Sequence, residues 1–407
     1  MEETTLIQQS LEFLHQQFKN YYYKHTPMLP DRFSRREFAF MFFNGKGMFR
    51  HISFSKKQDF QEFLKRKTPS HCYYSTAYYQ YPDAQKMNDK KWMGAELIFD
   101  LDADHLPNVD TITYEKQLEM VKEEFIKLIE DFLMKDFGFE EKYLELYFSG
   151  GRGYHCHVKD PKILQLDSGD RREIVDYIIG RDLMDTIIFH ESATGTKQYM
   201  GKSYVSGKKL EMPSINEPGW RGRISRGLIE ILEEIMKSDD PVQKLMEYGV
   251  NESTAKKLLK DLSQERIMRI KEGKLDQTKT IRKFFLNNAL RKTAVSFASG
   301  ETDEPVTCDV KRLIRLPGSL HGKTGFCVTP VTLDTLSSFD PLVDTVVLSD
   351  EQIVVDIRSN SDVVLNNESF HLSKGTCSVP LYLAVFLIGR KKAFYIKEKG
   401  YTGKEKR

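Results

Sequence analysis

The chain has 407 residues, of which 40% are hydrophobic and 12% aromatic, and its 61 basic and 59 acidic residues leave a formal net charge of only +2. This length exceeds one average domain, and the charge balance argues against a purely basic nucleic-acid coat. The isolated cysteines form no CxxC pair, which argues against disulfides and a zinc knuckle and indicates a reducing cytoplasm. We recognise no signal peptide and no membrane-spanning run, so we expect a soluble cytoplasmic protein without a membrane partner.

The first half of the chain predicts alternating helices and strands. Apolar residues recur at helical spacing over 4–24, and two β-rich runs, 36–43 and 48–54, flank a turn with two glycines and predict a hairpin. The other expected elements are helices over 56–67 and 114–136 and strands over 71–79, 95–104, 144–150 and 154–158. The helix over 114–136 is strongly amphipathic.

The second half changes character after about residue 165. Residues 169–190 and 218–292 are charged and mostly helical, with Asn251 or Ser253 as a helix N-cap. Strand signals return at 306–310, and the apolar stretch 381–389 is predicted as core rather than interface. We therefore divide the chain into a core in two parts, 1–165 and 296–345, a mainly helical insertion, 166–295, and a C-terminal α/β extension with a basic tail, 346–407.

An acidic pair closes the strand predicted over 95–104. Residues i and i+2 of a strand share a face, so Asp100 and Asp102 project together, roughly 6–7 Å apart, while Leu101 points into the sheet. Adjacent carboxylates repel each other, and Mg²⁺ or Mn²⁺ removes that cost because hard cations prefer oxygen ligands. We expect the pair at the carboxyl end of the strand, where open α/β sheets bind ligands. The alternative is that the pair belongs to a solvated acidic turn. Asp104 shares the face of the pair, but we expect it to serve in a turn.

A glycine-rich loop, Ser149–Gly153, joins the next two predicted strands. Glycines let backbone amides face an anion, and Arg152 adds a guanidinium fork that fits phosphate. His155 and His157 share one face of the following strand, and His155, nearer the loop, is the better candidate for a phosphate contact. Cys156 points away from both, which argues against a zinc site. A purely structural hairpin turn is the alternative.

A third segment, 307–326, combines a carboxylate, cations and a histidine. Asp309 is expected in a short strand, and a third carboxylate is what a two-metal site needs. Lys311, Arg312 and Arg315 are candidates for triphosphate contacts, and His321 and Lys323 follow a turn at residues 317–319. Taken alone, the segment is equally consistent with a basic turn on the surface.

Taken in order, WMGAELIFDLDADH (92–105), YFSGGRGYHCHV (147–158) and CDVKRLIRLPGSLHGKTG (308–325) resemble the catalytic small subunit of archaeal and eukaryotic DNA primases. REFAF (36–40) and STAYY (75–79) are also similar to early segments of that family. The joint occurrence is specific, whereas each motif alone is not. The resemblance implies a primase–polymerase fold, an α/β (α+β) catalytic core of mixed β-sheet and helices with a helical insertion.

The resemblance also assigns roles to residues. By it, Asp100, Asp102 and Asp309 are catalytic aspartates that hold Mg²⁺ or Mn²⁺. The residues that it places at the nucleotide phosphates or beside them are Ser149, Arg152, His155, Arg315, His321 and Arg36. Many members carry a Cys/His zinc knuckle after the first acidic motif, but residues 103–140 contain His105 and no cysteine. The sequence therefore gives no support for a structural zinc.

The resulting hypothesis is template-directed synthesis of short primers on single-stranded DNA, from NTPs or dNTPs, by a nucleoid-associated nucleotidyltransferase. The family acts with a primase large subunit that carries an iron–sulfur cluster, and a replicative polymerase would act downstream. Basic residues of the insertion, or near Arg36 and Arg50, are expected to follow the template backbone. The alternatives are a primase–polymerase acting in repair or end joining, a non-catalytic nucleic-acid-binding subunit, and a metal-dependent nuclease. The retained aspartates argue against the second, and the basic residues after Asp309 argue against the third.

Overall fold

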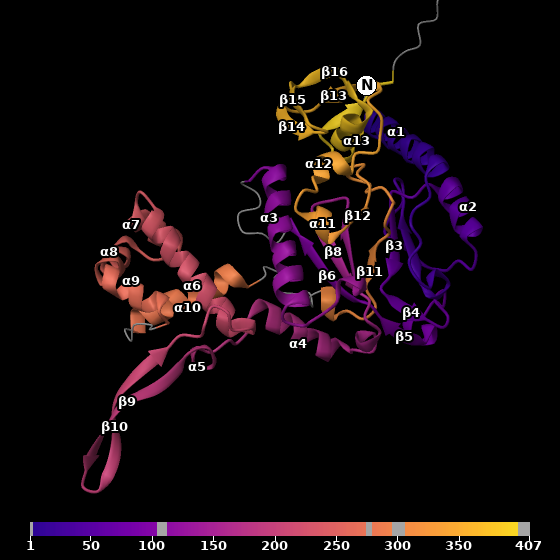
Figure 1. The fold of residues 1–407 in the computed structure, drawn as a ribbon. Helices are drawn as coiled ribbons and strands as arrows, with labels where there is room; N and C mark the ends of the chain where they lie inside the picture. Colours follow the sequence, from indigo (N-terminus) through magenta and orange to yellow (C-terminus); the bar gives the residue numbers. More distant parts are fainter. Residues whose placement is uncertain (1–2, 104–111, 274–278, 295–305, 398–407) are drawn as a thin grey trace, which may run out of the picture. The chain divides into compact units, whose positions relative to one another are not determined.

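A computed structural model describes residues 3–103, 112–273, 279–294 and 306–397 (Figure 1). The predicted turn residue Asp104 and its neighbour His105 lie outside the described residues. The chain forms two compact units: the first comprises residues 1–129, 139–175 and 297–407, and the second comprises 130–138 and 176–296. Helices and strands occur in both units, which confirms a mixed α/β protein.

Two four-stranded sheets form the centre of the first unit, with strand orders β11-β3-β1-β2 and β12-β7-β8-β6. The strands are β1 (Phe38–Met41), β2 (Phe49–Ile52), β3 (His71–Ser75), β6 (Leu97–Asp102), β7 (Leu144–Phe148), β8 (Gly153–Val158), β11 (Leu313–Arg315) and β12 (Thr329–Val331). The β1–β2 pairing confirms the hairpin predicted over 36–54. The strand predicted over 71–79 is instead two strands in different sheets, because β4 (Ala77–Tyr79) pairs with β5 (Trp92–Ala95).

Every strand pairing among the residues that the structure describes is antiparallel. β6, which carries the acidic pair, is an edge strand of its sheet. The pair lies at the carboxyl end of β6, as predicted, but the ligand rule used to support that prediction applies to parallel sheets with a topological switch point and not to this antiparallel sheet. The position of the acidic pair has to be explained from its own neighbours.

Helices cover these sheets in the first unit (Figure 1). They are α1 (Glu3–Lys24), α2 (Lys57–Lys67) and α3 (Tyr114–Lys127). α3 continues as a π-helix over Leu128–Met134, whose residues 130–134 belong to the second unit, and α4 (Ser168–Ile179) belongs to the first unit only up to residue 175. α3 packs on β6 and β8, and the ring of Phe125 stacks on that of Tyr154 with centroids 5.1 Å apart. The helices predicted over 4–24, 56–67 and 114–136 are confirmed, because each has an apolar stripe that a sheet can bury.

The segment before β11 differs from its prediction. Val306–Cys308 is a 3₁₀ turn rather than a strand. Thr307 and Cys308 are both buried, whereas consecutive residues of a strand point to opposite faces. Packing against β6 therefore overrides the β propensity of these residues.

The C-terminal part of the first unit is a second group of strands around one apolar helix. Its elements are α11 (Leu333–Leu336), α12 (Pro341–Asp344), β13 (Gln352–Ile357), β14 (Ser361–Leu365), β15 (Glu368–Leu372), β16 (Gly375–Pro380), α13 (Leu381–Gly389) and β17 (Ala393–Tyr395). Leu381 through Ile388 are all buried, which confirms that the apolar stretch is core. The first helix packs on the last strand, because the rings of Phe13 and Tyr395 stack with centroids 4.3 Å apart.

The second unit contains helices and one long hairpin. Its helices are α5 (Asp185–Ile188), α6 (Gly219–Lys237), α7 (Pro241–Glu247), α8 (Glu252–Asp261), α9 (Gln264–Lys271) and α10 (Lys279–Thr293). Asn251 caps α8 by accepting the Thr254 N–H, as predicted. The hairpin of β9 (His190–Tyr199) and β10 (Lys202–Glu211) was not predicted, because its sequence lacks the alternation of a strand with one buried face. No helix within the described ranges is long and apolar enough to cross a membrane.

Candidate active site

The acidic pair lies directly opposite the strand that follows the glycine-rich loop. In the β6–β8 ladder, Asp100 pairs with His155 and Asp102 pairs with Gly153. Residues directly opposite each other share a face of the sheet, and Nε2 of His155 lies 3.2 Å from Oδ1 of Asp100. Leu101 is buried on the other face, as predicted. The pairing register therefore places the two aspartates and His155 on one surface.

The carboxyl group of Asp100 is held in its charged form. Burial acts to raise its pKa, but the charge and hydrogen bond of His155 and the charges of Arg312 and Arg315 act against it, and the resulting pKa lies below the ordinary value. The two arginines belong to the third sequence segment. Their effect on Asp100 shows that the first and third segments are electrostatic neighbours.

The loop between β7 and β8 is fixed by Ser149. Its Oγ accepts the N–H groups of Gly151 and Gly153, at 3.3 and 3.2 Å. Two of the amides that we expected to face an anion thus donate within the loop. A Cβ at residue 153 would lie 2.2 Å from the Leu101 carbonyl oxygen, so only glycine allows β6 and β8 to pair beside Asp102.

The same loop packs directly against His321. A Cβ at Gly151 would lie 3.3 Å from Nε2 of this histidine, and Oγ1 of Thr324 donates to the carbonyl oxygen of Gly150 at 2.6 Å. Tyr114 of α3 donates to the carbonyl oxygen of Gly151, also at 2.6 Å. The second and third sequence segments are therefore joined at this point.

His321 lies among positive charges. Burial lowers its pKa well below the ordinary value, and Arg315, His71, Lys323 and Arg152 lower it further. A buried histidine near several cations stays neutral. The electrostatic surroundings of His321 thus combine Arg152 from the glycine-rich loop with Arg315 and Lys323 from the third segment.

His71 also lies beside His321, although the sequence analysis did not identify it as a site residue. Its ring lies 4.8 Å from the ring of His321, and Nη1 of Arg315 lies 2.7 Å from its Nδ1. Burial, Arg315 and Lys323 lower the pKa of His71 to about 3. The contact depends on the pairing of Arg315 with Tyr73 across β11 and β3. A sequence pattern along β3 carries no sign of a partner more than 240 positions away.

Asp309 follows the 3₁₀ turn that packs on β6. Its Oδ1 accepts the backbone N–H of Lys311 at 2.8 Å. Within the part of the chain that the structure describes, no three His, Cys, Asp or Glu side chains converge closely enough to hold one metal ion. The structure therefore brings Asp309 to a segment adjoining Asp100 and Asp102 without bringing the three carboxylates to one point.

Comparisons with known proteins decide the family. Residues 99–333 match the DNA primase small subunit family. The chain is 41% identical to the DNA primase small subunit PriS of Methanosarcina barkeri over 96% of this chain and 98% of that protein. It is also 41% identical to the protein of the same name from Picrophilus torridus, over 94% of this chain and 97% of that one. The chain belongs to the DNA primase small subunit family. The predicted resemblance is thereby confirmed, and so is the prediction of a primase catalytic subunit, which is a nucleotidyltransferase.

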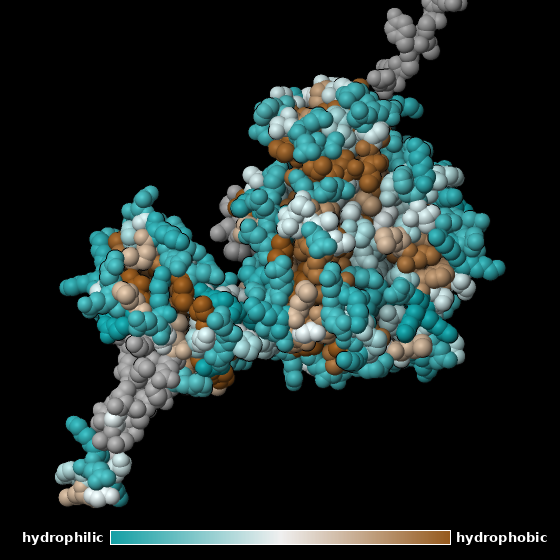
Figure 2. Space-filling view, in the orientation of Figure 1, coloured by the Kyte–Doolittle hydropathy of each residue, from teal (hydrophilic) through white to brown (hydrophobic). Residues whose placement is uncertain are grey.

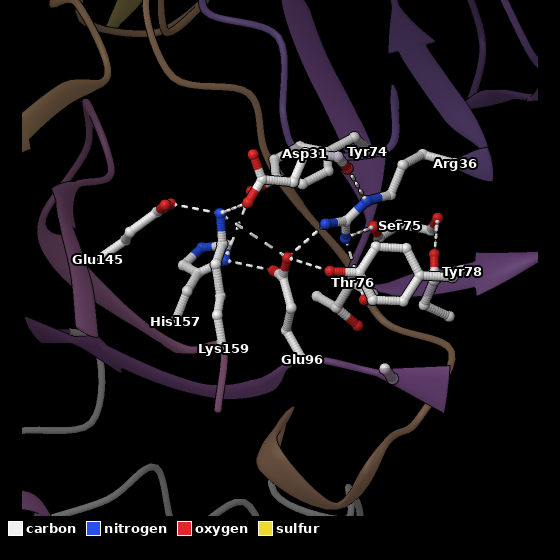
Figure 3. A network of polar contacts seen from close by, with 12 residues as sticks. Asp31, Arg36, Tyr74, Ser75, Thr76, Tyr78, Glu96, Glu145, His157 and Lys159 are labelled. Atoms are coloured by element: carbon white, nitrogen blue, oxygen red, sulfur yellow. Dashed lines mark hydrogen bonds and ion pairs between the residues drawn. The ribbon is translucent and has the colours of Figure 1, made fainter. Parts of the chain in front are cut away.

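Arg36 takes a different place in this primase subunit from the one expected beside the nucleotide. Figure 3 shows its guanidinium pointing into a buried network with Glu96, Tyr78 and His157. Four of its donors are used there: Nε binds the carbonyl oxygen of Asp31, Nη1 binds those of Ser75 and Thr76, and Nη2 binds the Glu96 carboxylate. Arg36 and Glu96 are both fully buried. The geometry makes Arg36 a link between strands of the primase core.

His157 completes that network. Its Nδ1 lies 2.9 Å from the Glu96 carboxylate, as expected of a structural sheet residue, but its buried Nε2 has no hydrogen-bond partner among the described residues. His155, two residues earlier, faces Asp100 instead. The two histidines of the primase motif therefore serve different carboxylates, one structural and one at the acidic pair.

Proposed function

We propose that this primase subunit synthesises short primers on single-stranded DNA by two-metal nucleotidyl transfer. The proposal rests on one observation. The ionised carboxylate of Asp100, with Asp102 two residues away, lies opposite strand β8. The loop before β8 packs on His321, which is surrounded by positive charges. An acidic pair beside a group of cations is the arrangement that a nucleoside triphosphate and its metal ions require.

The donor set fits hard divalent cations. Asp100 and Asp102 offer carboxylate oxygens on one face of β6, and Asp309 of the adjoining segment would have to move closer to supply a third. Mg²⁺ or Mn²⁺ at these oxygens would neutralise the triphosphate and increase the acidity of the primer 3′-hydroxyl. The chain itself keeps Asp100 ionised, and His155 fixes the orientation of that carboxylate.

The phosphate side of the proposed site comprises Arg152, Arg315, His321 and Lys323. Ser149 acts through the backbone, because it holds the loop that carries Arg152. His321 stays neutral. Because Thr324 uses its hydroxyl proton on the Gly150 carbonyl oxygen, the one N–H of His321 donates from Nδ1 to Oγ1 of Thr324. We leave Arg36 out of the phosphate-binding group, because its side chain is fully buried and four of its five donors are occupied in the network.

The proposed partners follow from the family. Its members are named small subunits, so we propose a heterodimer with a primase large subunit. Single-stranded DNA serves as the template, NTPs or dNTPs are the substrates, and a replicative polymerase extends the product. Repair or end joining is the alternative use of the same chemistry. Co-purification with a candidate large subunit, followed by a primer-synthesis assay, tests the replicative assignment.

The chemistry is tested by Asp100→Ala with Asp102→Ala in the full chain. The protein is incubated with a template, a labelled primer, nucleotides and Mn²⁺, and the products are separated by gel. The expected result is loss of extension, with no shortening of the primer by either protein. Asp59→Ala with Asp350→Ala, which removes two exposed carboxylates of the same unit, is the matched control and should extend normally. Near wild-type extension by the Asp100 and Asp102 variant would overturn the proposal, and shortened primers would indicate a nuclease.

A further inference from the structure

The β9–β10 hairpin is held firmly at its base. The N–H of Met212, just after β10, donates to the carbonyl oxygen of Gly273 at 2.9 Å. Arg221 of α6 donates from Nη1 to the carbonyl oxygen of Ile188 at 2.6 Å, and Ser225 of the same helix donates to that of Pro213 at 2.8 Å. Helix α6 therefore binds the chain on both sides of the hairpin, and the two strands extend from that base (Figure 1).

The tip of the hairpin is a two-residue turn with a defined set of side chains. Met200 and Gly201 have φ values of 49° and 73°, as in the tight turns that suit the twist of paired strands. Tyr199 pairs directly with Lys202, so the two side chains share a face. Lys197, two residues before Tyr199, lies on that face as well. One face of the tip thus presents an aromatic ring between two lysines.

These side chains are open to solvent. Residues 197–203 are all exposed, with Tyr199 exposed by 66% and Met200 by 85%. Hydrophilic and near-neutral residues dominate the tip of the hairpin in Figure 2, with one small, weakly hydrophobic area. A two-stranded ribbon is only marginally stable by itself in water, so a binding partner would stabilise this one.

The charge of the segment indicates what that partner is. From Ser192 to Leu210 the sequence contains four lysines and no Asp or Glu, in a chain whose overall charge is nearly balanced. An exposed aromatic ring among lysines offers a stacking surface for a base and cations for its flanking phosphates. A protein interface would instead favour a contiguous apolar core and few lysines.

We propose that the tip of this hairpin, Lys197, Tyr199, Met200 and Lys202, is a binding site for single-stranded DNA. The site lies outside the acidic pair and the phosphate-binding loop, and it rests on the proposed function only in taking DNA as the nucleic acid. Tyr199 stacks on a base, and Lys197 and Lys202 bind phosphates on either side of it.

The test measures binding of the full chain to a fluorescent oligothymidine by anisotropy, between low and moderate salt, without nucleotides or divalent ions. Lys197→Ala with Lys202→Ala should reduce the slope of log affinity against log salt by about 1.4, since each single-strand phosphate contact contributes about 0.7. Tyr199→Ala should weaken binding about ten-fold, as expected for one stacked base. The control is Lys237→Ala with Lys256→Ala, two exposed lysines of the same unit that pair with Glu233 and Glu252, and it should change neither quantity.

Two results would overturn the proposal. One is an unchanged salt slope and affinity in both hairpin variants. The other is unchanged DNA binding together with loss of a co-purifying large subunit, which would make the tip a protein-docking element. The variants alter only exposed side chains, so an unchanged thermal melt confirms that they fold. Because this assay omits nucleotides and metal, its outcome is independent of the Asp100 and Asp102 extension assay.

Discussion

Arg315 donates a hydrogen bond from Nη1 to Nδ1 of His71 across 2.7 Å, and the backbone N–H of Gly322 points at the same nitrogen from 3.2 Å. Both partners are donors, so Nδ1 of His71 is an acceptor and the ring is neutral. The histidine thereby fixes the guanidinium of Arg315 next to His321. This contact links a residue of strand β3 to the proposed phosphate-binding group.

Removing the acceptor should weaken nucleotide binding. His71→Ala frees the guanidinium of Arg315, and we expect the KM for the incoming nucleotide to rise about ten-fold, the effect of one hydrogen bond to a charged group. His71→Asn keeps an acceptor oxygen and should restore most of the affinity. Steady-state primer extension at varied nucleotide concentration measures both. Equal KM values for the Ala and Asn variants would contradict a positioning role.

The neutral state of His71 should also make the stability of the protein depend on pH. The pKa is about 3 in the folded protein and about 6.5 in an unfolded chain. The unfolded chain therefore binds the extra proton first, so stability is fully present above pH 6.5 and falls as the pH drops towards 3. At pH 5.5 this one group lowers the free energy of unfolding by about 1.4 kcal/mol.

Urea denaturation at pH 7.5 and at pH 5.5 measures that loss. His321 and His157 also have lowered pKa values and contribute in the same direction, so the comparison is between wild type and His71→Asn. The variant should lose about 1.4 kcal/mol less between the two pH values. An identical loss in both proteins would show that the pKa of His71 is the same in the folded and the unfolded chain.

Gly153→Ala should disrupt the strand pairing beside the acidic pair. The new Cβ would lie 2.2 Å from the carbonyl oxygen of Leu101, which forces β6 and β8 apart and costs about 1–3 kcal/mol of stability. Gly169→Ala is the matched control, because residue 169 lies in the first turn of α4 and its Cβ would approach only a side-chain oxygen of Asp167, at 3.1 Å. Chemical denaturation of both variants measures the difference. A stable Gly153→Ala protein with full activity would show that the pairing at Asp102 is unnecessary.

Arg36→Met should destabilise the protein rather than weaken nucleotide binding alone. The substitution leaves the fully buried Glu96 carboxylate without its arginine partner, and breaking a buried ion pair in this way costs about 3–5 kcal/mol. Adding Glu96→Gln removes the uncompensated charge and should recover part of the loss. Arg152→Met, in the half-buried loop, should reduce nucleotide incorporation instead. An Arg36→Met protein of normal stability that fails to bind nucleotide would return Arg36 to the phosphate-binding group.

The elements that the sequence predicted correctly have a hydrophobic pattern of their own. The helices α1 and α3 repeat apolar residues with the helical period, and β6 starts as a short, continuous apolar run before its acidic end. These patterns are visible without any tertiary information. The β9–β10 hairpin escaped prediction for the opposite reason. The described residues around its tip are exposed on both faces, so burial leaves no periodic pattern there.

The residues of the candidate site likewise divide into those that the sequence identifies and those that only the fold reveals. Asp100 and Asp102 are recognisable because their spacing within one strand fixes their common face. His71 is not, because its role depends on the β3–β11 pairing. The family resemblance placed Arg36 and Ser149 near the nucleotide, and in the fold Arg36 donates to backbone carbonyl oxygens while Ser149 accepts two backbone N–H groups. Sequence spacing indicates which residues lie on one strand, but only packing determines which polar groups remain available.

The pairing of β11 with β3 also governs when the site can assemble during translation. Ile314 pairs with Tyr74, and a ribosome adding about 5–20 residues per second needs roughly 10–50 seconds to make the intervening chain. During that interval β3 is an uncovered edge of its sheet, and Arg315, the hydrogen-bond partner of His71, has not yet been synthesised. A nascent chain that stops within the insertion therefore presents an open strand edge for chaperones to protect, and it contains the acidic pair and Arg152 without Arg315 and Lys323, the other cations of the proposed site.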